Sequence, residues 1–270
     1  SVALDLFHAL NLKIVGISTD EHGMQVEKLE KLLQQYHPKL IYTIPNFHNP
    51  TGACLSSQRR RQLMALADRY NAPILEDDFV GDLRYEGRAQ PALKAFDPGG
   101  RVIYTSAFSK MLMPGLRVGF LAAEGPIYDS LVSYKRVNDL ATSNLLQRAL
   151  EAYVTVGRYQ AHLRRSCQVY RKRRDAMLLD INRHLPVETH VAPPQGGLFI
   201  WLRLPDHLSA RKLLPLACQE GVAFDPGNSF FPGDTDGKDY MRLNFAIQSP
   251  EDIEEGIKRL GRAIKHLAAS

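Results

Sequence analysis

The sequence predicts an α/β fold, in which a mostly parallel sheet is covered by helices and a smaller C-terminal α+β domain follows. Three observations lead to this prediction. Short apolar segments alternate with amphipathic helical patterns in the first part of the chain, a long helical region comes next, and the last part groups its strands and helices separately. We expect a large domain over residues 1–158, and an interdomain helix with the small domain over residues 159–270.

The large domain is expected to contain five short apolar strands, each of which ends at polar or turn residues. They span residues 13–17, 40–44, 73–75, 101–105 and 118–122. Strands that are apolar throughout are typical of a parallel sheet with both faces covered. Apolar residues at helical spacing predict helices over 26–36 and again after Ser56, whose hydroxyl is suited to cap a helix N-terminus.

The rest of the chain is expected to be mostly helical. Helical spacing covers residues 143–156, 159–185 and 210–220, and two apolar strands are expected at 197–202 and 240–245. A last helix is signalled by Ser249 as its N-cap, Pro250 at its first position and Asp252 completing a capping pattern.

Composition narrows the class of protein. Of the 270 residues, 44% are hydrophobic and 23% charged, as in ordinary globular proteins. No apolar run approaches the roughly 18 residues of a membrane span, so we expect no membrane partner. The three cysteines, Cys54, Cys167 and Cys218, form no CxxC pair. This favours reduced thiols in a cytoplasmic protein over a zinc site or a disulfide framework.

The net charge of +5 raises the question of an anionic partner. The basic runs at 59–61, 164–165 and 171–174 all lie within helical patterns. We interpret them as solvated helix faces, and we expect this chain to make no direct contact with nucleic acid.

Polar residues follow three of the expected strands, at the sheet edge where α/β proteins bind ligands. Asn49 lies in the turn after the second strand, Asp77 and Asp78 follow the third, and Ser109 and Lys110 follow the fourth, with Arg117 beyond them. Each alone is explained as a turn, a helix cap or a solvated side chain. Together they match the needs of pyridoxal phosphate: a lysine amine for its Schiff base, an acid against the pyridine nitrogen and cationic contact for its phosphate.

Five ordered stretches, spread over nearly the whole chain, carry a family resemblance. They are YTIPNFHNPTG, ILEDDFVGDLRYEG, FSKMLMPGLRVGFL, QGGLFIWLRLP and YMRLNFA. The chain resembles the class I/II aminotransferases of the pyridoxal-phosphate fold type I, above all the branch shared by aminoadipate-type aminotransferases and MocR-type regulators. The resemblance implies a homodimer with its active site at the two-fold interface.

The resemblance also implies roles for individual residues. Lys110 would form the Schiff base and later act as general base, Asp77 would contact the pyridinium nitrogen, and Asn49 would bind the phenolic oxygen. Ser109 and Arg117 would bind the phosphate.

Arg242 would pair with the substrate α-carboxylate, although an arginine in mid-strand is alternatively an edge residue facing water. Three positions depart from the family pattern. Phe79 and Val80 stand where a tyrosine is usual, and Ala107 replaces a phosphate-binding hydroxyl. The chain also begins about a hundred residues later than the family's catalytic domain, so we expect it to be a fragment.

Three functions follow from these patterns. The first is a pyridoxal-phosphate-dependent aminotransferase that moves an amino group between an α-amino acid and a 2-oxo acid through Lys110. The alternative is the effector domain of a MocR-type transcriptional regulator, whose winged-helix domain is absent from this chain. The third is a binding or structural α/β domain without the cofactor.

Overall fold

The computed structural model describes residues 2–233 and 236–269. It divides into two compact units. Unit 1 comprises residues 1–16, 49–52 and 168–270, and unit 2 comprises residues 17–48 and 53–167. The long helix α6 (Arg158–His184) contributes residues to both units. The division into domains at residue 158 stays a prediction.

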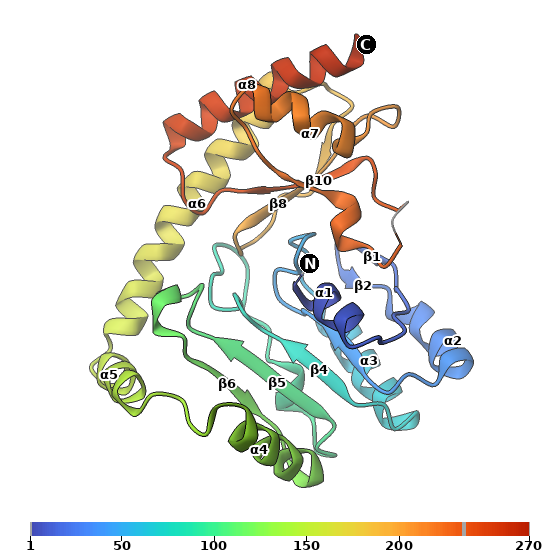
Figure 1. The fold of residues 1–270 in the computed structure, drawn as a ribbon, viewed down its shortest axis with the longest axis vertical. Helices are drawn as coiled ribbons and strands as arrows, with labels where there is room; N and C mark the ends of the chain where they lie inside the picture. The colour runs from blue at the N-terminus through green and yellow to red at the C-terminus, as the bar shows by residue number, and fades with distance from the viewer. Residues whose placement is uncertain (1, 234–235, 270) are drawn as a thin grey trace. The chain divides into compact units, whose positions relative to one another are not determined.

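Unit 2 is built on a four-stranded sheet. Its strands are β3 (Ile41–Thr43), β4 (Ile74–Asp77), β5 (Val102–Ala107) and β6 (Gly119–Ala122), in that spatial order (Figure 1). The first three strands are parallel, and β6 is antiparallel to β5. The carboxyl ends of the parallel strands therefore lie at one edge of the sheet, as the α/β prediction requires.

The helices of unit 2 follow the strands in the expected alternation. They are α2 (Val26–Tyr36), α3 (Ser57–Arg69), α4 (Gly125–Asp139) and α5 (Asn144–Thr155), with short 3₁₀ helices η1 (Leu93–Phe96) and η2 (Pro114–Leu116) and a small hairpin of β1 (Thr19–Asp20) and β2 (Gly23–Met24). The predicted cap is confirmed, because Ser56 Oγ accepts a 3.3 Å hydrogen bond from the backbone nitrogen of Arg59.

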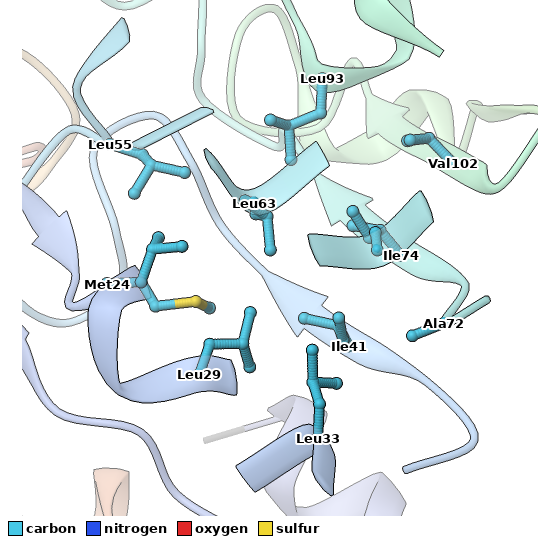
Figure 2. Packing of buried hydrophobic residues seen from close by; sticks show 12 residues of the cluster. Met24, Leu29, Leu33, Ile41, Leu55, Leu63, Ala72, Ile74, Leu93 and Val102 are labelled. Atoms are coloured by element: carbon cyan, nitrogen blue, oxygen red, sulfur yellow. The ribbon is translucent and has the colours of Figure 1, made fainter. Parts of the chain in front are cut away.

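One hydrophobic core holds α2 and α3 against the sheet. Leu29 and Leu33 of α2, Leu63 of α3, and Ile41 and Ile74 of the sheet point toward one another (Figure 2). All five are at most 6% exposed. Burial of apolar side chains of this size contributes roughly 1.5–3 kcal/mol each, so this cluster holds the first residues of β3 and β4 against α2 and α3.

Unit 1 contains a second sheet, which is antiparallel. Its strands, in spatial order, are β7 (His190–Val191), β8 (Phe199–Arg203), β10 (Tyr240–Asn244) and β9 (Asp225–Pro226). Its helices are α1 (Val2–Ala9), α7 (Ala210–Gln219) and α8 (Pro250–Ala268), with the short 3₁₀ helix η3 (Gly227–Phe230). Helices α7 and α8 lie side by side against this sheet (Figure 1). Ser249 caps α8 as predicted, accepting a 3.1 Å hydrogen bond from the nitrogen of Asp252.

Three sequence expectations are wrong. Residues 13–17 form no strand, because a strand needs a neighbour for its backbone groups and none pairs with this segment in the described part of the chain. All four residues of β6 are exposed, so that strand is not covered on both faces. The basic runs are not uniformly solvated, because Arg60 and Arg174 are only 1% and 4% exposed.

Within residues 2–233 and 236–269, none of the helices combines the length and the apolar composition needed to cross a membrane.

Candidate active site

Asp77 ends β4 at the sheet edge formed by the carboxyl ends of the parallel strands and is half-buried. Its Oδ2 accepts a 2.7 Å hydrogen bond from the hydroxyl of Tyr42 on β3. Burial raises the pKa of the Asp77 carboxyl, and the hydrogen bond from Tyr42 opposes that rise. Tyr42 in turn has its pKa raised by burial and by the neighbouring carboxylate, so its hydroxyl stays a donor. The hydrogen bond from Tyr42 therefore orients the Asp77 carboxylate at the edge of the sheet.

The next residue, Asp78, is held by a different set of contacts. Its Oδ1 accepts from Asn46 Nδ2 at 2.9 Å, and its Oδ2 accepts from Tyr104 Oη at 2.9 Å. Its backbone nitrogen donates to the Thr105 carbonyl at 2.9 Å, which continues the pairing of β4 with β5. Both oxygens of Asp78 are thus used to tie neighbouring segments together, which separates its role from that of Asp77.

Arg60 of α3 holds the loop between β3 and α3 through hydrogen bonds. Its guanidinium donates to Asn46 Oδ1 at 2.7 Å and to the carbonyl oxygens of Pro45, Leu55 and Pro91 at 2.9, 2.9 and 3.0 Å. Arg60 belongs to the basic run at 59–61, which we expected on a solvated helix face. A signal was present, because Arg60 shares the helical stripe of Leu63 and Ala67, all three of which are buried.

Glu76 was also missed. It is 0% exposed and lies on the face of β4 opposite Asp77, since successive residues of a strand alternate between faces. Its carboxylate accepts hydrogen bonds from the backbone nitrogens of Leu93 and Lys94, at 2.8 and 3.0 Å, and so caps η1. Burial raises its pKa. It is a structural group rather than a ligand-binding one.

The cationic residues follow β5. Lys110 lies in the turn three residues beyond the strand and is exposed, and Ser109 beside it is half-buried. Arg117 is exposed and adopts a left-handed backbone conformation with φ 50° at the end of η2. Ser106 is buried and donates to the Asp78 carbonyl at 2.9 Å, so its hydroxyl is directed away from the position left without an oxygen by Ala107.

The tyrosine missing after Asp77 leaves an apolar environment. Val80 is 0% exposed, and Phe79 is half-buried. Neither side chain offers a hydroxyl, so neither can make the hydrogen bond that a tyrosine at this position would make.

The other two predicted residues lie in unit 1 and contact each other. Arg242 Nη1 donates a 2.7 Å hydrogen bond to Asn49 Oδ1. The Arg242 side chain is 17% exposed, and β10, which carries it, runs between β8 and β9. The alternative of an edge-strand arginine facing water is therefore wrong.

Unit 2 also contains a cavity of about 260 Å³ near the sheet. Aromatic side chains and two carboxylates line it, including Tyr104, Phe108, Tyr159, Asp78 and Asp82. The six predicted site residues are not part of its lining. The Tyr159 hydroxyl donates to Asp82 Oδ2 at 3.3 Å, and burial raises the pKa of that carboxyl.

The structure therefore defines an α/β protein that presents a carboxylate, a lysine and an arginine at the end of a mostly parallel sheet. The chain belongs to the aminotransferase class I and II family, whose model matches residues 6–260.

The most informative relatives are aminotransferases. The chain is 40% identical, over 97% of its length, to aromatic-amino-acid aminotransferase 1 of Thermococcus litoralis, and it covers 64% of that protein. It is 36% identical, over 99% of its length, to 2-aminoadipate transaminase of Thermus thermophilus, covering 68% of it. The solved structure of Pyrococcus horikoshii kynurenine aminotransferase matches with a TM-score of 0.93 and 38% identity, over 98% of this chain and 66% of that one.

A second group of relatives is named as regulators. The chain is 32% identical, over 99% of its length, to the HTH-type transcriptional regulator YisV of Bacillus subtilis, and it covers 55% of that protein. The chain thus spans about two thirds of the length of the related aminotransferases and about half that of this regulator.

Proposed function

We propose that this chain is a pyridoxal-phosphate-dependent aminotransferase domain, which transfers an amino group between an α-amino acid and a 2-oxo acid through a Schiff base on Lys110. One observation carries the proposal. Asp77 is the last residue of β4 and Lys110 lies three residues beyond the adjacent parallel strand β5, at the sheet edge where α/β proteins bind ligands. The relatives supply the reaction class, since those with an enzyme name transfer amino groups.

The residues of unit 2 fit the cofactor. An acid, a primary amine, a hydroxyl and a guanidinium are the donors that its ring nitrogen, aldehyde and phosphate require. The Thermus thermophilus structure named LysN was solved with a phosphopyridoxyl-leucine compound, and it matches this chain with a TM-score of 0.93 and 35% identity. When bound, pyridoxal phosphate supplies an electron-withdrawing ring that stabilises negative charge at the substrate α-carbon.

The chain's own residues then have separate tasks. Asp77 holds a proton on the ring nitrogen by charge, and Tyr42 keeps the carboxylate oriented. The exposed amine of Lys110 would act as the general base, taking the proton from the substrate α-carbon and giving it back in a 1,3-shift. Ser109 and Arg117 bind the phosphate.

Asn49 and Arg242 lie in unit 1, and the family resemblance implies their roles. Asn49 would bind the phenolic oxygen of the ring, and Arg242 would bind the α-carboxylate of the substrate. The hydrogen bond between the two side chains lies within unit 1 and holds them together. The same proposal includes that the protein forms a homodimer, as the family resemblance implies, and that it lies in the cytoplasm.

The regulator is a second candidate. It is favoured by the relatives named as HTH-type regulators and by Phe79 and Val80, which stand where the family resemblance implies a tyrosine. In that case the same residues would bind the cofactor without sustained amino transfer.

The two candidates are separated by a turnover assay. The chain loaded with pyridoxal phosphate is incubated with 2-oxoglutarate and either an aromatic amino acid or 2-aminoadipate, and glutamate is quantified by chromatography. We expect glutamate from at least one donor in many-fold excess over the protein, and none from Lys110→Ala. Cofactor bound at Lys110 with no glutamate from either donor would support the regulator instead.

A further inference from the structure

Asp225 forms an ion pair with Arg242 across two neighbouring strands of unit 1. Strand β9 runs antiparallel to β10, and the register places Asp225 opposite Arg242. Residues opposite each other on antiparallel strands lie on the same face with their side chains in contact range. The pairing of β9 with β10 therefore brings a carboxylate to the arginine that we assign to the substrate.

The contacts show which edge of the guanidinium Asp225 occupies. Asp225 Oδ2 accepts from Arg242 Nη2 at 2.7 Å and from Nε at 3.2 Å. The third nitrogen, Nη1, donates to Asn49. The Nε–Nη2 edge is one that a carboxylate binds through two parallel hydrogen bonds, so Asp225 already takes a position that a ligand carboxylate would use.

Aromatic rings hold the guanidinium in this place. The Cζ atom of Arg242 lies 4.1 Å from the ring centre of Phe199 and 4.7 Å from that of Phe230. The Arg242 side chain is 17% exposed, whereas that of Asp225 is 53% exposed. The arginine is thus fixed by its neighbours, and the aspartate is the partner that is free to turn toward water.

We infer that Asp225 is an internal competitor for the substrate carboxylate and sets the affinity of the site for carboxylate ligands. The inference rests on the proposed role of Arg242. With Asp225 in place, the pair carries no net charge, so an incoming carboxylate must displace the aspartate and then bind beside its negative charge. An uncharged side chain at position 225 leaves the arginine with its full charge for the ligand.

The molecule contains its own reporter for this exchange. Trp201, the one tryptophan in the sequence, lies opposite Arg242 on β8, which flanks β10 on the side away from β9. The centre of its ring lies 5.6 Å from the centre of the Phe230 ring. Its fluorescence can follow binding at Arg242 without cofactor or turnover. The ligand is propanoate, titrated at constant ionic strength, and propylamine controls for contacts that need no carboxylate.

Three variants are compared with the unsubstituted chain. Asp225→Asn removes the competing charge while keeping the size of the side chain. Asp206→Asn removes a carboxylate of the same unit, which is 85% exposed and pairs with Arg203 at 2.7 Å, and so controls for overall charge. Arg242→Gln removes the proposed receptor.

We expect Asp225→Asn to lower the Kd of propanoate by about threefold or more. A partly exposed ion pair contributes a free energy of that order, and propanoate no longer has to break it in the variant. Asp206→Asn should leave the Kd unchanged, and Arg242→Gln should abolish binding. In the turnover assay, the KM of the amino donor should fall by the same factor as the Kd, an effect that a merely structural residue would not produce.

Two results would overturn the inference, and they differ in what else they affect. An unchanged or higher Kd in Asp225→Asn, with binding lost in Arg242→Gln, would mean that Asp225 holds the arginine ready for its ligand. Unaltered binding in Arg242→Gln would show that propanoate binds elsewhere, and it would remove the proposed role of Arg242 as well.

Discussion

Arg60 Nη2 donates a 2.7 Å hydrogen bond to Asn46 Oδ1, and Asn46 in turn donates to Asp78 at the end of β4. This relationship links a buried helix residue to the sheet edge that carries the candidate site. It explains why an arginine that is 1% exposed persists on the apolar stripe of α3. Burial lowers the pKa of Arg60, and the nearby carboxylate of Glu76 partly offsets that effect.

We expect Arg60→Met to destabilise the protein by about 2–4 kcal/mol, because the carbonyl oxygens of Leu55 and Pro91 and the amide oxygen of Asn46 lose their donor. The Pro45 carbonyl keeps its hydrogen bond from the Leu55 nitrogen. Arg61→Met is the matched control, since Arg61 is the adjacent exposed residue of α3, and its effect should stay within about 0.5 kcal/mol. Urea unfolding followed by circular dichroism measures both. Equal midpoints for the two variants would mean that the Arg60 network does not stabilise the fold.

The two adjacent aspartates should separate in their effects. Asp77→Ala should weaken binding of pyridoxal phosphate about tenfold or more, because a charged hydrogen bond to the ring nitrogen is lost. Asp78→Ala should instead destabilise the fold by roughly 2–4 kcal/mol, since Asn46 and Tyr104 lose their acceptor.

Cofactor titration by visible absorbance and urea unfolding, applied to both variants, test this division. If Asp78→Ala abolished cofactor binding in a protein of unchanged stability, while Asp77→Ala bound normally, the ring-nitrogen role would belong to Asp78.

The ion pair between Asp20 and Arg59 predicts a pH dependence of stability. Arg59 Nη1 and Nη2 contact the two oxygens of Asp20 at 2.5 and 2.8 Å, and the hydrogen bonds lower the pKa of Asp20 to about 2. A carboxyl whose pKa is lower in the folded than in the unfolded state stabilises the fold above its unfolded pKa, near 4. That contribution is lost as the pH falls toward 2.

Asp20→Asn should therefore cost about 1 kcal/mol of unfolding free energy at pH 7, an amount reduced by solvent screening, and the difference should shrink between pH 4 and 2. Glu27→Gln is the control, because Glu27 contacts the same arginine at 3.4 Å but is 59% exposed. Urea unfolding at pH 7, 4 and 2.5 gives the comparison. A difference that is independent of pH would show that the Asp20 charge does not act through Arg59.

Local signals in the sequence were enough for much of the fold. The caps at Ser56 and Ser249, the apolar strands β3 to β5 and the residues at their ends all depend on nearby residues. Features that depend on distant pairing were not predictable in this way. Residues 13–17 have the composition of a strand, but they form none because no neighbouring segment of the described chain pairs with them. Asp225 contacts Arg242 only because of the register in which β9 pairs with β10.

Among the site residues, the sequence predicted Asp77 and Lys110 just after neighbouring strands. Lys110 does lie beyond β5, whereas Asp77 is itself the last residue of β4. It did not reveal that Tyr42 contacts Asp77 or that Arg60 supports Asn46, because these contacts join segments that the one-dimensional pattern leaves unrelated. The roles of the site residues toward cofactor and substrate stay predictions.

The most direct test of the account is the covalent position of the cofactor. The chain is titrated with pyridoxal phosphate, reduced with borohydride and digested, and the labelled peptide is identified by mass spectrometry. We predict one dominant label on Lys110, which is absent from Lys110→Ala. A label distributed over surface lysines, to the same extent in the chain and in Lys110→Ala, would contradict the account.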